Sequence, residues 1–402
     1  MVNLGDRAYH VGLHELISGH LGHRIIMGPV KALPYLTRRK TARIRSTDDA
    51  RELLGSWLTA ATRRRGPPSP AQARLQRSLE GNYLTRTRMF QRADEAVRRR
   101  FARGILETLS PYVFRRRFVN ALVDKIEQAD VVVFNGGAFV ADHLDKYLPM
   151  VLFELYLAKQ LGKRTAVVNQ TVAVRRPHNR ALVSFVYSRL DAHFVREPRS
   201  KAVLEEMGVA ADRVHLSCDA AFGIRVPEAR SGSQGLSGQV GICVRGDRSV
   251  RSEFWANVAR RLAVEHGKTP VFFFTSRYQD WKAFEQIRRH YPGCTFLDFC
   301  DYPELIERLR HLDFIITDRY HATIFAILAE TPFITLDSNT FKTRGLMDMV
   351  DFSVDVMRND GDIDLMARNI AYVCANREHL SRQLHKARLQ LSNFARTSLE
   401  AL

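Results

Sequence analysis

From residue 129 onward, short apolar runs alternate with longer segments in which apolar residues recur at helical spacing. Short apolar runs are typical of buried strands, and helical spacing with an apolar face is typical of the helices that connect them. Strict alternation of the two patterns predicts a parallel sheet covered by crossover helices. In the first half of the chain, the expected strands are 129–137, 163–171, 191–197 and 212–219, and the expected helices are 146–162, 179–190 and 198–208.

A stretch rich in glycine and serine, VPEARSGSQGLSGQ at 226–239, interrupts this alternation and has the composition of a linker. Alternation then restarts and continues to residue 337, and residues 377–399 form the pattern of a basic amphipathic helix. A chain of 402 residues is also too long for one ordinary core. We therefore expect an α/β protein with two doubly wound Rossmann-like domains in a glycosyltransferase-B-like arrangement, with the ligand in a cleft between them. The expected limits are 1–226 for the first domain, 227–239 for the linker and 240–402 for the second domain.

Residues 35–120 show only weak helical periodicity and predict an irregular helical insertion in the first domain. Residues 61–120 contain fifteen arginines against four acidic residues, in a chain whose formal net charge is +18. Such a surface attracts anionic lipid headgroups, a phosphorylated substrate or nucleic acid, and the alternative is a solvated arginine-rich face without a partner. Because no aromatic platform or known binding motif accompanies the charge, we expect no nucleic-acid partner.

The bulk composition restricts the location of the protein. No run of about 18 apolar residues occurs, and the N-terminus lacks a basic segment followed by an apolar run. We therefore expect a cytoplasmic protein, with peripheral contact to the inner face of the membrane through the arginine-rich segment. The cysteines are scattered without a CxxC pair, which is typical of reduced thiols and argues against a structural zinc site. The five cysteines are Cys218, Cys243, Cys294, Cys300 and Cys374.

The stretch HLDFIITDRYHATIFAILAETPFITLDSN, residues 311–339, places polar residues where a buried strand turns into a helix. The first turn of a helix presents unpaired N–H groups and a partial positive charge. Arg319 adds a fork of donors, and His321 adds a group that titrates near neutrality. Together they predict an anion site with a proton-transfer residue. In the alternative interpretation, Arg319 pairs with Asp318 and His321 only caps the helix.

Other expected strand ends carry similar features. Arg196 ends one strand and Ser200 lies one helical turn later, so both can face one anion, unless Arg196 pairs with Glu197 or Asp191 instead. Cations recur at strand ends in the second half, where Arg245 and Lys342 lie. Gly136 and Gly137 also follow a strand, where a bare backbone can approach a ligand or simply form a turn.

The motifs NLGDRA, FNGGAFV, FVREPRSKAVLEEMGV, DAAF and DRYHATIFAILAETPFITLDSNTFKTRGL resemble those of the polysaccharide pyruvyl transferase family. The resemblance covers about residues 3–14 and 129–350. It implies transfer of a pyruvyl group from phosphoenolpyruvate to two hydroxyls of a sugar, which forms a cyclic ketal on a bacterial surface polysaccharide or its lipid-linked precursor. By similarity, the donor's phosphate and carboxylate are held by Arg196, Arg319, His321 and Lys342, with Ser200 in support and Arg245 added to the donor side.

This chemistry requires a general acid, for which we choose His321, and a base for the sugar hydroxyl. Asp6 is a candidate base, although an aspartate in such a turn more often stabilises the turn or caps a helix. Asn3 and Gly5 belong to the same turn on the acceptor side. Family members have a full strand before this turn, whereas this chain begins MVNLGD, so the strand is either missing or replaced. We expect no metal and no cofactor beyond the donor substrate.

Two other functions remain open. A glycosyltransferase with the same architecture would use a nucleotide sugar and would need a carboxylate for the ribose, for which Glu330 is the candidate. A basic scaffold at the membrane without catalysis is the non-enzymatic alternative. The joint presence of Arg196, His321 and Lys342 argues against it.

Overall fold

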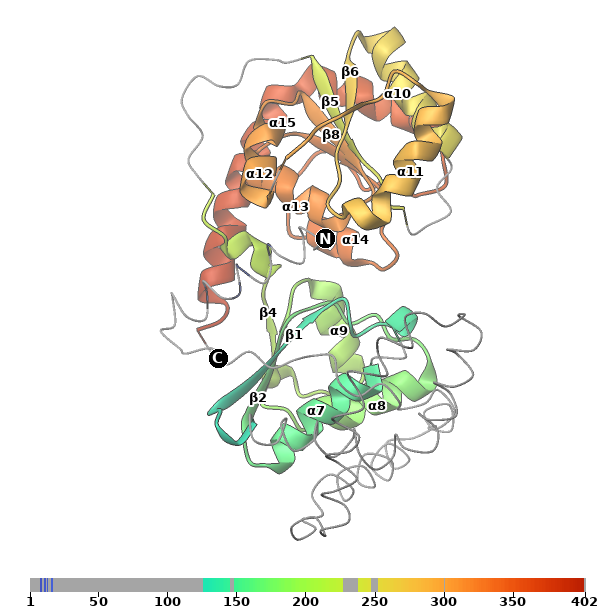
Figure 1. The fold of residues 1–402 in the computed structure, drawn as a ribbon. Helices are drawn as coiled ribbons and strands as arrows, with labels where there is room; N and C mark the ends of the chain where they lie inside the picture. The colour runs from blue at the N-terminus through green and yellow to red at the C-terminus, as the bar shows by residue number, and fades with distance from the viewer. Residues whose placement is uncertain are drawn as a thin grey trace, which may run out of the picture.

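The computed structural model describes residues 8, 11, 13, 16, 126–144, 148–226, 238–246, 252–299 and 301–400. These residues form two parallel sheets, one in each half of the chain, as the alternation predicted (Figure 1). Most of the expected linker, the arginine-rich insertion, and Asn3, Gly5 and Asp6 lie outside the described residues.

The first sheet has four parallel strands in the order β1-β2-β3-β4, so each strand pairs with the next one along the chain. One face packs against α7, α8 and α9 through an apolar cluster that includes Leu152, Val186 and Leu204. Pro177 and Pro198 stand in the first turns of α8 and α9, where a missing N–H costs nothing. The elements are β1 (Val131–Gly137), α7 (Leu148–Gln160), β2 (Arg164–Gln170), α8 (Pro177–Tyr187), β3 (Ala192–Val195), α9 (Pro198–Glu206) and β4 (Val214–Leu216), with short 3-10 turns at Asp142–Leu144, Ala211–Arg213 and Ala220–Gly223.

The second sheet has five parallel strands in the order β7-β6-β5-β8-β9. The strand order reverses between β5 and β8, and ligands of such sheets bind beyond the carboxyl ends of the strands at this reversal. Separate apolar clusters cover the two faces. The elements are β5 (Gln239–Cys243), α10 (Ser252–His266), β6 (Thr269–Phe272), α11 (Arg277–His290), β7 (Thr295–Phe296), α12 (Tyr302–Arg310), β8 (Phe314–Thr317), α13 (Tyr320–Ala329), β9 (Phe333–Thr335) and α14 (Lys342–Met347).

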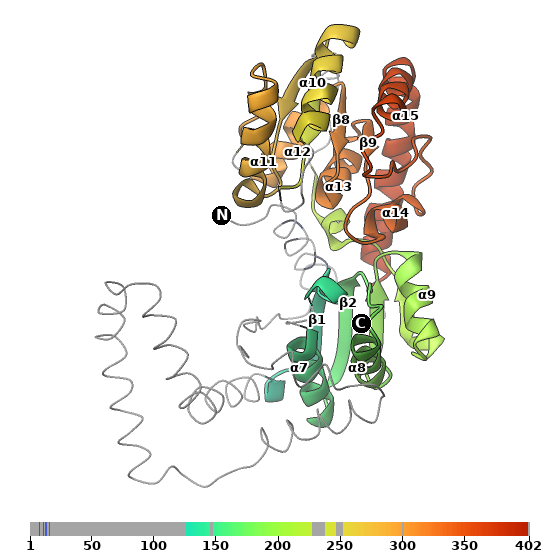
Figure 2. The ribbon, with the colours of Figure 1, turned by 90° about the vertical axis from the view of Figure 1, so that its right-hand side faces the viewer.

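The last helix, α15 (Ile363–Thr397), includes the expected tail helix and begins earlier than the sequence suggested. Its N-cap residue is Asp362, whose side chain accepts a hydrogen bond from the Leu365 N–H, and the helix is interrupted by non-helical backbone at Asn376. Its final part runs back to the first domain (Figures 1 and 2). There the Cys218 thiol donates to the Leu391 carbonyl at 3.2 Å. The helix therefore joins the two domains a second time, beyond the linker.

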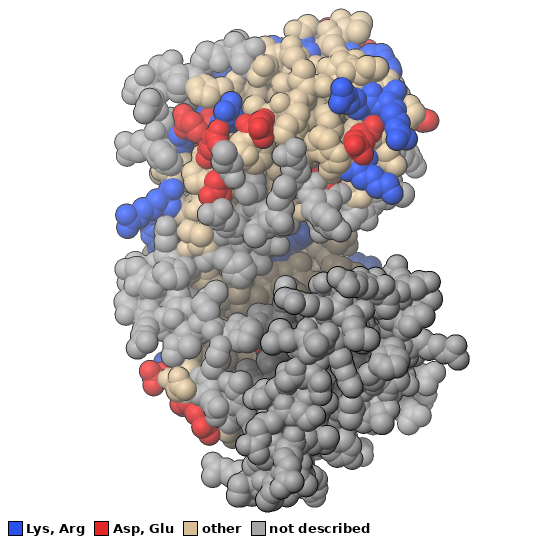
Figure 3. Space-filling view, viewed as in Figure 1, with Lys and Arg blue, Asp and Glu red and all other residues tan. Residues whose placement is uncertain are grey.

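On the face shown in Figure 3, the lysines and arginines of the described residues do not form a purely basic patch. On the second domain, lysines and arginines are interspersed with aspartates and glutamates. No helix within the described ranges has the length and apolar character needed to cross a bilayer. The expected membrane contact was assigned to the arginine-rich segment, which is not among the described residues.

Gly136 lies in β1 where this strand closely approaches β2. A Cβ atom added to Gly136 would lie 2.5 Å from the Gln170 Cβ and 3.3 Å from its Cα. Gly137 has a φ of +46°, a conformation that residues with a side chain rarely adopt. Both glycines had been assigned to the acceptor side, and for Gly136 the structure supplies a packing reason as well.

We predict that Gly136→Ala lowers the free energy of unfolding by about 1–3 kcal/mol, because the new methyl group must push two paired strands apart. Chemical denaturation of the two proteins measures this difference. Gly293→Ala is the matched control, since its nearest neighbour is the Tyr291 ring at 3.3 Å in an exposed turn. Equal denaturation midpoints for wild type and Gly136→Ala would contradict the prediction.

Candidate active site

The candidate site is built around the start of α13. Nearly all of this helix is apolar, and all its residues are buried except His321. A helix that is apolar on every side is held by packing all round, so its first turn has a fixed position. Arg319 is the N-cap residue, with its N–H donating to the Thr317 hydroxyl at 2.9 Å. Tyr320 and His321 are thereby held at the carboxyl edge of the second sheet.

Arg196 extends from the end of β3 in the first domain to this helix. Its guanidinium donates to Asp219 at 2.6 Å and to the Thr171 hydroxyl at 2.8 Å, and both members of the ion pair are almost fully buried. The same guanidinium lies 4.7 Å from the centre of the Tyr320 ring. The two domains therefore contact each other at a buried cation.

Lys342, the first residue of α14, is a second cation on the Tyr320 ring. Its Nζ lies 5.2 Å from the ring centre. Within the described part of the chain, no carboxylate oxygen lies within ion-pair distance of this Nζ. Burial and, after it, the charges of the nearby arginines lower the pKa of Lys342 to about 7, and Asp219 opposes them. The ammonium is thus close to losing its proton at neutral pH.

Arg245 and Arg319 lie at the strand reversal, beyond β5 and β8 respectively. Arg319 pairs with Asp280 of α11, not with Asp318 as the alternative interpretation had it. Asp318 instead accepts the backbone N–H of Arg245 at 2.8 Å. Burial raises the pKa of Asp318 to about 6, while this hydrogen bond and the arginines lower it. Asp280, through the Arg319 side chain, and Asp318, through the Arg245 backbone, thus hold the two arginines in place.

The pKa of His321 differs from the value expected from the sequence. Its side chain is partly buried, and burial lowers its pKa to about 3. The surrounding cations, Arg196 foremost, push the pKa in the same direction, and Asp219 opposes them. The sequence pattern had suggested titration near neutrality, but without an anion in the site the imidazole is neutral at pH 7.

Ser200 is fully buried and supports the site from behind. Its hydroxyl accepts the Val172 N–H at 2.7 Å and donates to Glu197. Glu197 also accepts from the Thr171 hydroxyl, and burial raises its pKa to about 7 against the effects of Arg196 and these hydrogen bonds. Gly345 of α14 packs on Glu197, since an added Cβ would lie 2.4 Å from the Glu197 Cγ. A larger residue at position 345 would thus separate α14 from the first domain.

Three residues of the site were not assigned from the sequence. Asp219 and Tyr320 both lie in motifs quoted for the family resemblance, so a signal for them existed. Asp280 lies within a helix 39 residues before its partner Arg319, and nothing in its local sequence distinguishes it. Only the packing of α11 against the strand ends brings it to the site.

Glu330, the carboxylate considered for a nucleotide sugar, lies at the opposite end of α13. It accepts from Arg388 at 2.6 Å and lies 3.1 Å from His385, both on α15. The helix rises by about 1.5 Å per residue, so its ten residues separate Glu330 from the cations by roughly 15 Å. Its role in the described structure is to tie α13 to α15.

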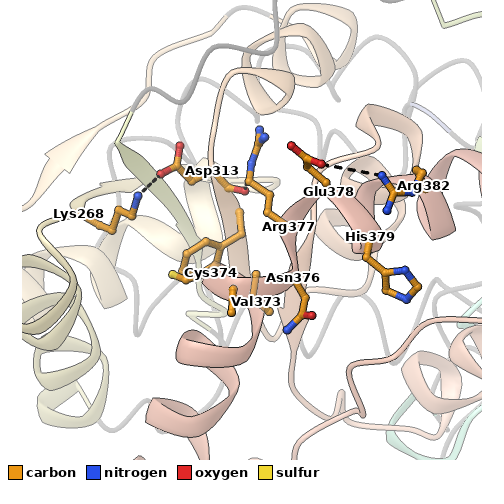
Figure 4. A pocket seen from close by; sticks show the side chains of 11 residues that line it. Lys268, Asp313, Val373, Cys374, Asn376, Arg377, Glu378, His379 and Arg382 are labelled. Carbon is orange, nitrogen blue, oxygen red and sulfur yellow. Dashed lines mark hydrogen bonds and ion pairs between the residues drawn. The ribbon is translucent and has the colours of Figure 1, made fainter.

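A separate pocket of about 450 Å³ opens beside the kink of α15 (Figure 4). Its lining includes Lys268 and Asp313, which pair at 2.6 Å, and Arg377 and His379 of α15. Lys268 precedes β6 and Asp313 precedes β8, so this pocket lies at the amino edge of the sheet. Ligands of parallel sheets bind at the other edge, and we therefore place the candidate site at the cations.

Comparison with known proteins places the chain among sugar-modifying enzymes. The model of a family described as polysaccharide pyruvyl transferase matches residues 3–340. No curated protein matches the chain.

Two solved structures align with most of the chain. A UDP-N-acetylglucosamine 2-epimerase aligns at 14% identity over 71% of this chain and 76% of its own, with a TM-score of 0.50. The HepE protein of Anabaena in complex with UDP aligns at 12% identity over 69% and 78%, with a TM-score of 0.49. At such low identity the likeness to the epimerase shows the fold alone, a glycosyltransferase-B-like pair of α/β domains.

We predict that Asp219→Ala lowers the free energy of unfolding by about 3–5 kcal/mol, because it removes the carboxylate that the buried Arg196 guanidinium binds at 2.6 Å. The second carboxylate of Arg196, the Glu197 neighbour that the sequence had offered as an alternative partner, lies farther away at 3.8 Å. Asp348→Ala provides the control. Asp348 pairs with Arg199 at 2.7 Å, but both side chains are about two-fifths exposed, so its loss costs about 1 kcal/mol or less. Thermal and chemical unfolding measure both variants, and equal losses would argue against the buried pair as a structural centre.

Proposed function

The chain belongs to the polysaccharide pyruvyl transferase family, and we propose that it transfers the pyruvyl group of phosphoenolpyruvate to two hydroxyls of a sugar. The family makes it a transferase with a polysaccharide acceptor. The proposed product is a cyclic ketal on a bacterial surface polysaccharide or its lipid-linked precursor. The proposed place of reaction is the cytoplasm, at the inner face of the membrane where the precursor is lipid-linked.

The observation that carries this proposal is the convergence of cations from two domains on Tyr320 and His321. Arg196 of the first domain and Lys342 of the second lie on the Tyr320 ring, and the charges of Arg245 and Arg319 are near enough to lower the pKa of Lys342. Phosphoenolpyruvate carries a phosphate and a carboxylate within a few ångströms of each other. Charge-assisted hydrogen bonds from separate cations suit such a ligand better than one isolated cation does.

The proposed reaction balances with proton transfer alone. The donor's methylene carbon gains a proton and becomes a methyl group, and its central carbon forms bonds to two sugar oxygens. The C–O bond to phosphate breaks and phosphate leaves with the electron pair. Two protons leave the sugar hydroxyls, of which one balances the new C–H bond and the other leaves on the phosphate. No oxidant or reductant is needed.

His321 is our candidate for moving these protons. At neutral pH the imidazole of His321 is uncharged, so it can accept a proton but cannot act as an imidazolium acid. A bound anion offsets the charges of Arg196 and Lys342 and so raises the pKa of His321 toward neutrality. In the complex, the imidazole therefore holds a proton more readily than in the free site, which is the direction that a general acid requires.

We predict that His321→Ala lowers acceptor-dependent phosphate release from phosphoenolpyruvate by about 10²–10⁴-fold, the usual contribution of a general acid or base. The assay compares release with and without a lipid-linked glycan extract. His311→Ala, at an exposed histidine after α12, is the control and retains activity. Unchanged release by His321→Ala would remove the histidine from the mechanism. Wild-type protein that neither releases phosphate nor binds phosphoenolpyruvate in calorimetry would disprove the proposed donor.

The lowered pKa of Lys342 predicts a pH dependence of donor binding. The lysine holds its proton below about pH 7 and loses it above, whereas the donor's phosphate is already ionised above pH 7. The Kd for phosphoenolpyruvate therefore rises by about tenfold per pH unit above pH 7, until the pH reaches the pKa of the lysine in the complex. Lys342→Arg keeps its charge and gives a nearly constant Kd between pH 7 and 9. Calorimetric titrations at several pH values test both, and a constant wild-type Kd would contradict the prediction.

A further inference from the structure

The Tyr320 ring is a contact point for two cations that come from different domains. Arg196 reaches it from the end of β3, with its guanidinium 4.7 Å from the ring centre, and Lys342 reaches it from α14, with its Nζ at 5.2 Å. The His321 ring meets the same tyrosine edge-on at 5.3 Å between centres. Tyr320 is 4% exposed, so these contacts are shielded from water.

The two cations disfavour each other, since the charge of Arg196 lowers the pKa of Lys342. An aromatic face attracts a cation through its quadrupole and carries no net charge. A carboxylate in the same place would attract both cations more strongly, but it would also neutralise them and repel an anionic ligand. Burial raises the pKa of the Tyr320 phenol well above its ordinary value, so the ring stays uncharged. The ring thus holds the two cations together without adding a negative charge to the carboxylate that already pairs with Arg196.

The hydroxyl of Tyr320, unlike the ring, contacts neither cation through a hydrogen bond. It is buried, and it has no hydrogen-bond partner among the described residues. A tyrosine hydroxyl in such surroundings usually finds a partner, because an unmade hydrogen bond costs free energy. The contacts that connect Tyr320 to Arg196 and Lys342 are those of the ring.

We propose that Tyr320 is a positioning residue whose ring holds Arg196 of the first domain and Lys342 of the second side by side, as one clamp for a phosphate-bearing anion. The proposal rests on the proposed function for the identity of the donor, but not for the clamp itself. Any compact phosphate anion meets the same pair of cations. Without the ring, Lys342 is free to turn toward water, and the anion must order the lysine at its own cost when it binds.

The test compares Tyr320→Leu, which removes the ring, with Tyr320→Phe, which keeps it. We expect Tyr320→Leu to raise the KM for phosphoenolpyruvate by about ten- to thirtyfold, as the loss of two cation–π contacts implies, with a smaller change in kcat. Tyr320→Phe retains most of the wild-type affinity. If Tyr320→Leu does not fold, Tyr320→Met replaces it as an unbranched apolar substitute. Tyr372→Leu, at a tyrosine of α15 that is 40% exposed, controls for loss of a ring elsewhere.

Calorimetric titration with inorganic phosphate separates this proposal from the function on which it rests. Wild-type protein that binds phosphate but not phosphoenolpyruvate contradicts the proposed donor, while the clamp is still supported if Tyr320→Leu weakens phosphate binding. The clamp is overturned if Tyr320→Leu binds phosphate as tightly as wild type does and also binds phosphoenolpyruvate as tightly as wild type does. A Tyr320→Phe variant as impaired as Tyr320→Leu also overturns it, since the hydroxyl would then be the important group.

Discussion

The cost of burying positive charge at the contact between the two domains shapes this structure. A buried cation is stable only when it is paired and hydrogen-bonded. Arg196 meets this condition through Asp219 and Thr171, and Arg319 meets it through Asp280. Lys342 is the least well paired of these cations, because the contact that its ammonium makes among the described residues is with the Tyr320 ring. Its pKa is lowered to about 7, chiefly by burial. The positive charge of the proposed donor site is thus least compensated at Lys342.

The fold keeps this arrangement from relaxing. The apolar α13 is held by packing on every side, so the cations at its first turn cannot withdraw into solvent by moving the helix. At its other end, Glu330 is held by Arg388 of α15, and α15 in turn contacts the first domain at Cys218. The close contact of Gly345 with Glu197, the N-cap residue of α9, fixes α14 against the start of α9. Mutual repulsion of the cations would otherwise favour separation of the domains.

Much of this could be predicted from the sequence because it depends on local patterns. Alternating strands and helices predict parallel sheets, and parallel sheets align the ends that carry Arg196, Arg245 and Arg319. Long-range pairing was not predictable in the same way. Asp280 lies in the first turn of α11, far from Arg319 in the sequence, and its selection as the partner of Arg319 depends on how α11 packs. Asp318, the obvious neighbour in the sequence, is instead occupied by the Arg245 backbone.

The protonation state of His321 was unpredictable for the same reason. A histidine in isolation titrates near neutrality, but its pKa here reflects burial and the summed charges of residues from both domains. That dependence connects binding to chemistry in the proposed reaction. In that proposal, an anion that offsets the charges of the cations raises the pKa of His321, so the imidazole holds a proton more readily when the donor is present. After the pyruvyl group is transferred, phosphate departs with much of the donor's charge, and the pKa of His321 falls again. The cations proposed to bind the donor would thereby favour proton transfer in the occupied site.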